Sequence, residues 1–109
     1  MRKPMWLLRL MEYILPARKV NVIESDTPPD KLPIRNIVLA KEDDEEWAVG
    51  FKCPCGCGRH LELLLIKEAK PNWKLTVDEK NRPTLYPSIW LKKGCRSHFW
   101  LRKGKVVWC

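Results

Sequence analysis

Four cysteines and one histidine in two short segments carry side chains that bind transition metals. Cys53, Cys55 and Cys57 alternate with Pro and Gly, and Cys95 and His98 follow much later at C-x-x-H spacing. Thiolate and imidazole are the ligands that zinc prefers, in a tetrahedron of four. We therefore expect a zinc site made of four of these five residues. The spacing does not decide which of the three alternating cysteines stays free.

Other chemistry stays open at these residues. Mixed cysteine and histidine ligation also occurs in iron–sulfur centres, which need a second histidine, and His60 lies beside the first segment. Buried cysteines without a metal are a further alternative, although three alternating thiols would make a poor core. A catalytic zinc needs an open ligand position and a nearby acid or base. Glu62 is close in sequence, but such a residue more often faces solvent on a strand.

Two serines are candidate nucleophiles. Ser97 lies between Cys95 and His98, where a metal or the imidazole of His98 could polarise its hydroxyl. Ser88 follows Pro87 in an apolar run and is the second candidate. The alternative for both is a hydroxyl that bonds nearby backbone groups, which is the commoner role of such residues.

Cysteine usage indicates a reducing compartment. The chain has 5 cysteines, an odd number, and C-x-C-x-C spacing does not favour pairing among neighbours. They are therefore interpreted as metal ligands rather than disulfide partners, with Cys109 as a spare thiol. We find no convincing secretory signal and no apolar run of the roughly 18 residues that a membrane-spanning helix needs. We expect a cytoplasmic protein.

The formal net charge of +8 favours an acidic partner. A soluble protein with a lysine-rich surface is the simpler explanation, because the chain has no dense Lys/Arg run. Basic and aromatic residues interleave at 90–93 and 99–103, which is also typical of a nucleic-acid platform. Alternation along a strand would instead place some of these aromatic residues in the core.

The elements that must position these residues are one helix and several short strands. Residues 1–20 have an apolar stripe at helical spacing, and Pro16 predicts a helix end near Leu15. The stripe is Trp6, Leu7, Leu10, Met11 and Ile14. We expect this helix to pack on the domain, with partner docking or a membrane surface as alternatives.

Period-two alternation and turn signals predict the strands. Their ranges are 36–40, 47–52, 61–67, 73–77, 84–91, 97–102 and 105–108. Residues 21–35 are expected to be irregular, and residues 41–46 to form an acidic turn. Pro87 inside a strand predicts an edge or a bulge, and Lys103-Gly104 predicts a hairpin.

The expected fold is a single domain, 1–109, of the mostly β (α+β) class. Residues 47–109 would form its metal-binding β core, a small antiparallel sheet held by zinc. The two cysteine segments would be zinc-ribbon-like, although C-x-C is tighter than the usual C-x-x-C.

The order of motifs from residue 47 to the end resembles a small bacterial family. Its pattern is C-x-C-G-C-G, a Trp before a strand, L-x-P-S-I, C-x-S-H-[FY]-W and V-x-W. In this chain the motifs are 53–58, Trp73, 85–89, 95–100 and 106–108. The chain departs from the pattern at Trp90, where the family usually has Gly, and at Cys109, which replaces a small residue.

Members of that family are often encoded beside bacterial ubiquitin-like proteins and their E1-like and E2-like enzymes. The resemblance implies a zinc-binding peptidase that processes or removes the ubiquitin-like protein at its C-terminus. It carries over Cys53, Cys55, Cys57, Cys95 and His98 as metal-site positions, and Ser88 and Ser97 as hydroxyls that could attack a carbonyl. The alternative is a non-enzymatic zinc module that docks the ubiquitin-like protein, an E2-like enzyme or nucleic acid.

Overall fold

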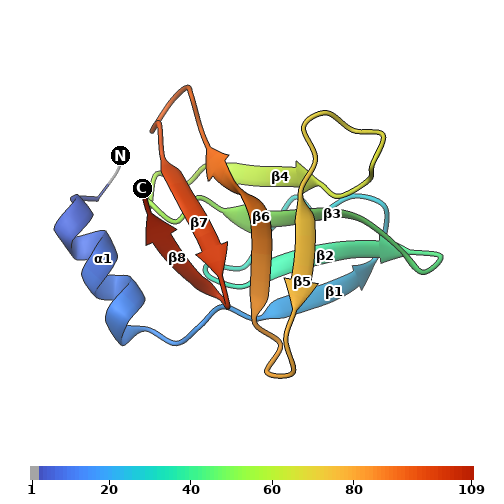
Figure 1. Ribbon diagram of the computed structural model, residues 1–109, viewed down its shortest axis with the longest axis horizontal. Helices are drawn as coiled ribbons and strands as arrows, with labels where there is room; N and C mark the ends of the chain where they lie inside the picture. Colours follow the sequence, from blue (N-terminus) through green and yellow to red (C-terminus); the bar gives the residue numbers. More distant parts are fainter. Residues whose placement is uncertain (1–2) are drawn as a thin grey trace.

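The protein is mostly β, with one helix at its N-terminal end. A computed structural model describes residues 3–109, and Met1 and Arg2 lie outside the described residues. Within the described part, one helix precedes eight strands that form two four-stranded sheets (Figure 1). The expected fold class is confirmed, although the strands divide between two sheets.

The first sheet has the order β1-β2-β3-β4. Its strands are β1 (Val20–Glu24), β2 (Ile37–Glu42), β3 (Glu45–Lys52) and β4 (His60–Leu64). The prediction of an irregular segment at 21–35 missed β1, which pairs with β2 in parallel, whereas the strands that were predicted all pair antiparallel with one another. As an edge strand, β1 buries only Val20, so its burial does not follow the alternation expected of a half-buried strand.

The second sheet has the order β5-β6-β7-β8 and is antiparallel throughout. Its strands are β5 (Lys74–Val77), β6 (Pro83–Trp90), β7 (His98–Arg102) and β8 (Lys105–Trp108). The predicted hairpin at Lys103-Gly104 is confirmed, with φ of 47° and 77° at these two residues. A side chain at Gly104 would come within 2.5 Å of the Arg18 carbonyl oxygen, so glycine is needed there.

The core lies between the two sheets, whose strands cross steeply in Figure 1. Phe51 of β3 and Phe99 of β7 meet edge to face with ring centroids 6.4 Å apart. Cys53 and Cys55 belong to the same buried cluster. The cysteine loop is therefore packed against residues from both sheets.

Helix α1 (Met5–Ile14) packs beside β8 and ends where Pro16 predicted. The predicted apolar stripe does not face the core. Trp6, Leu10 and Ile14 are exposed, and the buried residue of the helix is Leu8, which lies outside the predicted stripe. No helix among residues 3–109 is long and apolar enough to cross a membrane.

Glu12 anchors the helix to the second sheet. Its carboxylate accepts two hydrogen bonds from Arg18, at 2.6 and 2.9 Å, and one from the backbone N–H of Val106 at 2.8 Å. Burial raises the pKa of Glu12, but these hydrogen bonds and the nearby charge of Arg18 outweigh it, so the pKa is lowered. Arg18 is itself buried and has Glu12 as its charge partner.

Replacing Glu12 with alanine should lower the free energy of unfolding by about 3 kcal/mol, because the Arg18 guanidinium is left buried without its partner. Urea unfolding at neutral pH measures this loss, with Glu12→Gln as the control that keeps an acceptor oxygen. The wild type's advantage over Glu12→Gln should disappear as the pH falls through the lowered pKa of Glu12. Equal stability of all three proteins at neutral pH would contradict this role.

Candidate functional site

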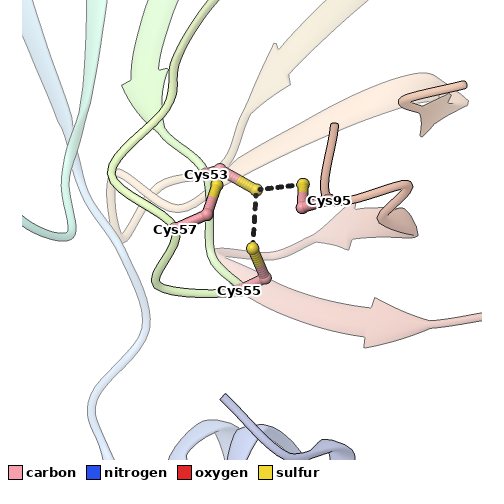
Figure 2. Close-up of side chains that lie close together, drawn as sticks. All are labelled: Cys53, Cys55, Cys57 and Cys95. Carbon is pink, nitrogen blue, oxygen red and sulfur yellow. Dashed lines mark hydrogen bonds between the residues drawn. The ribbon is translucent and has the colours of Figure 1, made fainter. Parts of the chain in front are cut away.

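Two loops bring the cysteines together. Cys53, Cys55 and Cys57 lie in the loop between β3 and β4, and Cys95 lies in the loop between β6 and β7. Gly56, with φ of +89°, reverses the first loop in a conformation that other residues rarely adopt. Figure 2 shows the four side chains converging from these two loops. The cluster therefore joins the first sheet to the second.

The four sulfur atoms lie within 4.8 Å of one another. The Cys53 sulfur is 3.4 Å from that of Cys55 and 3.7 Å from that of Cys95 (Figure 2). These separations are well beyond the roughly 2.05 Å of a disulfide bond, so none of the four cysteines is paired in a disulfide. Four convergent thiols are a donor set that can hold a metal ion.

The environment favours thiolate at one of these cysteines and opposes it at another. Burial raises the pKa of Cys53. Burial also acts to raise the pKa of Cys95, but hydrogen bonds from the side chain and backbone of Ser97 and from neighbouring thiols lower it to about 6. Cys95 is therefore the thiol that the fold prepares best to enter metal binding as an anion.

The expected ligand set must be corrected. The expectation was four ligands out of five, with one of the alternating cysteines free and His98 as a candidate. The structure groups all three alternating cysteines with Cys95, and His98 is not part of the group. His98 is the first residue of β7, and its side chain meets Ser88, whereas the side chain of the preceding Ser97 meets the thiols.

Ser97 lies with the thiols. Its side chain is 0% exposed, and its Oγ is 3.2 Å from the Cys95 sulfur and 3.8 Å from the Cys53 sulfur. Its carbonyl accepts a hydrogen bond from the Leu91 N–H at 2.8 Å, which closes the loop between β6 and β7. Ser97 therefore supports the cysteine cluster and lies beneath the surface.

Ser88 lies in a bulge of β6. The ladder with β7 pairs Leu85 with Leu101 and then Ile89 with Phe99, so two extra residues of β6 lie between the pairs. Pro87, which has no N–H to donate, is inside this stretch. The predicted bulge is confirmed. Bulges redirect side chains and are common next to active sites.

The bulge brings the Ser88 hydroxyl to the imidazole of His98. Ser88 Oγ is 3.1 Å from His98 Nε2, and both side chains are partly exposed. With the ring proton on Nδ1, Nε2 can accept the hydroxyl hydrogen bond. A hydroxyl at this distance from an imidazole has the geometry of a nucleophile and its general base.

Trp90 orients the histidine ring. The Trp90 indole stacks on the His98 imidazole with centroids 5.1 Å apart and 14° between the planes. The two residues are directly paired across β6 and β7. No carboxylate of residues 3–109 pairs with this imidazole, and the stacking on Trp90 restricts the plane of the ring together with the hydrogen bond to Ser88.

Sequence reasoning missed the part played by Trp73. Its indole Nε1–H donates to the Ser88 carbonyl at 3.4 Å, and its backbone N–H donates to the Leu64 carbonyl at 2.9 Å. Trp73 thereby links the end of β4 to the bulge. The sequence identified Trp73 as the first residue of a predicted strand, but no sequence signal connected Trp73 with Ser88.

Other candidates lie away from both groups. Glu62 and His60 are exposed on β4, and Glu62 pairs with Gly50 of β3. Cys109 is an exposed free thiol whose N–H donates to the His98 carbonyl at 3.0 Å. None of these three residues belongs to the four-thiol group.

The comparisons with known proteins agree with this chemistry. A family model described as "Bacterial ubiquitination-like system serine protease (BubE)" matches residues 24–109. The match includes the four clustered cysteines, Ser88 and His98, and leaves α1 and most of β1 outside it. Neither the curated proteins nor the solved structures give a match. Since the family model covers most of the chain, the chain belongs to the BubE family of bacterial ubiquitination-like system serine proteases.

Proposed function

We propose that this chain is a peptidase that cleaves the ubiquitin-like protein of a bacterial ubiquitination-like system at its C-terminus, with Ser88 as nucleophile and His98 as general base. The observation that carries this proposal is the 3.1 Å contact between Ser88 Oγ and His98 Nε2. The family description, a serine protease of such a system, supplies the reaction class and the pathway.

The proposed reaction has two stages. Ser88 Oγ attacks the scissile carbonyl carbon while His98 Nε2 takes the hydroxyl proton, and the protonated imidazole then gives this proton to the leaving amine. The C–N bond breaks and an acyl ester remains on Ser88. In the second stage His98 takes a proton from water, and the resulting hydroxide displaces Ser88 Oγ, which regains its proton.

In this scheme His98 works without a carboxylate partner. A triad acid holds its histidine in the right tautomer and orientation. In this chain stacking on Trp90 restricts the plane of the ring. The Trp73 hydrogen bond to the Ser88 carbonyl fixes the peptide that carries the nucleophile. Both indoles therefore act as positioning residues.

We infer that the metal is zinc and that it is structural. Zinc–sulfur bonds of about 2.3 Å in a tetrahedron place sulfurs about 3.8 Å apart, close to the 3.4 and 3.7 Å separations around Cys53. Cys53, Cys55, Cys57 and Cys95 would hold the ion and fill its coordination sphere. A closed site has no position for water or substrate, so its role would be to fix the loop between Trp90 and His98.

Processing of a precursor tests the substrate. The ubiquitin-like protein encoded with this chain's own system, extended by several residues at its C-terminus, should be cut once, and mass spectrometry should show a single new C-terminus. A conjugate of the same protein should release the same product. The proposal fails if neither the precursor nor the conjugate is cleaved by protein that contains its metal.

A further inference from the structure

The outer face of the second sheet carries aromatic and basic side chains around Ser88 and His98. Along β7, Phe99 and Leu101 point into the core, so His98, Trp100 and Arg102 share the opposite face. On β6, Tyr86 and Trp90 contact Trp100 and His98, which places them on this face too. Tyr86 is 65% exposed and Trp90 58%. We call this set the outer aromatic face.

Two cations are held on this face by the rings. The Lys92 ammonium lies 4.9 Å from the centroid of Trp90, and the Arg102 guanidinium lies 4.7 Å from that of Trp100. Both side chains are exposed, and neither forms an ion pair with any residue in the described range 3–109. Cation–π contacts restrict the two side chains without neutralising their charge.

These contacts favour carboxylates over nucleotide bases as ligands. A nucleic-acid platform needs open ring faces on which bases can stack. The ring of Trp90 is already in contact with His98 and Lys92, and that of Trp100 with Tyr86 and Arg102. The cationic groups free to form new contacts on this face are the ammonium and the guanidinium, which donate hydrogen bonds to carboxylates.

We propose that the outer aromatic face is the substrate-docking surface and that Lys92 and Arg102 bind acidic side chains of a polypeptide on either side of its scissile bond. The proposal rests on the proposed function in placing the scissile bond at Ser88. Lys92 contacts the ring that stacks on His98, and Arg102 contacts the ring next to Tyr86, so the two cations lie on different sides of the bulge. An extended segment across Ser88 would meet both.

Binding to peptides tests this surface without catalysis. The probes are a fluorescein-labelled decapeptide of alternating Gly and Glu, its counterpart with Gln for Glu, and a labelled 20-nucleotide dT strand. The protein is the full chain carrying Ser88→Ala, so that no probe is cleaved. The Glu peptide should bind, and the Gln peptide should bind at least about tenfold more weakly at low salt.

Matched variants locate the binding. Lys92→Gln with Arg102→Gln should weaken binding of the Glu peptide about tenfold, at about threefold for each exposed cation. Lys31→Gln with Arg9→Gln removes the same charge from exposed positions elsewhere and should change binding less than twofold. The proposal would be overturned if the two double variants lost the same amount of affinity for the Glu peptide. It would also be overturned if the Glu and Gln peptides bound equally, or if the Glu peptide did not bind at all.

The nucleic-acid alternative and the dyad give separate outcomes. Tighter binding of the dT strand than of the Glu peptide, lost in the Lys92/Arg102 variant, would overturn the proposal in favour of a nucleic-acid surface. Failure of the Ser88–His98 mechanism would appear in cleavage measurements and would leave these binding results unchanged. Each failure is therefore recognisable by itself.

Discussion

Replacing Ser88 with alanine is expected to lower kcat/KM for cleavage of the ubiquitin-like precursor by about 10³-fold or more. The hydroxyl contacts His98 at the surface bulge and supports no core packing. The melting temperature and metal content should therefore stay at the wild-type values. Initial cleavage rates at several substrate concentrations measure kcat/KM, and calorimetry and elemental analysis of the same preparation measure the melting temperature and the metal content.

Ser97→Ala is the matched control, because it also removes one serine hydroxyl, from the residue that immediately precedes His98. Its hydroxyl bonds thiols in the interior, so cleavage should stay within about threefold of wild type. The free energy of unfolding should fall by about 1 kcal/mol, the usual net worth of one hydrogen bond. Loss of cleavage in Ser97→Ala together with full activity in Ser88→Ala would reverse the assignment of the nucleophile.

Replacing Cys55 with serine should weaken zinc binding and destabilise the fold. Its side chain is 0% exposed, and its sulfur is one of the four that converge. If four thiolates share roughly 12 kcal/mol of binding free energy, losing one costs about 3 kcal/mol, or roughly 100-fold in zinc affinity. The melting temperature should fall by more than about 10 °C. Zinc per chain by elemental analysis and thermal unfolding measure the two effects.

Cys109→Ser is the control for this change. Cys109 is an exposed thiol outside the cluster. The zinc content and the melting temperature of the Cys109→Ser protein should therefore match those of the wild type. About one zinc per chain in wild type, lost in Cys55→Ser and kept in Cys109→Ser, is the expected result. Iron with visible absorbance in the purified protein, or unchanged zinc in Cys55→Ser, would contradict a structural zinc site.

Most of the fold follows from local patterns in the sequence. Strands β7 and β8 bury the side chains of one face, so alternation predicted their positions, and Lys103-Gly104 predicted the turn between them. Strand β1 was missed because it is an edge strand with a single buried side chain. Its parallel pairing joins residues far apart in the chain, and no local signal specifies such a pairing.

The candidate site was predictable in composition but not in arrangement. Spacing singled out the cysteines, both serines and His98, and it left the partners of each open. Which serine meets His98 depends on the register of β6 against β7, and the bulge at Pro87 adds two residues to that register. Because side chains alternate between faces, Ser97 turned inward to the thiols and His98 turned outward to Ser88.

Covalent labelling tests the role of Ser88 most directly. The full chain with its metal bound is treated with a fluorophosphonate, a reagent that phosphonylates activated serines, and the adduct is located by mass spectrometry of peptides. Labelling should occur at Ser88 and should be lost in His98→Gln, because the imidazole takes the proton as Oγ attacks. An adduct at Ser97, or labelling of Ser88 that is unchanged in His98→Gln, would contradict the Ser88–His98 mechanism.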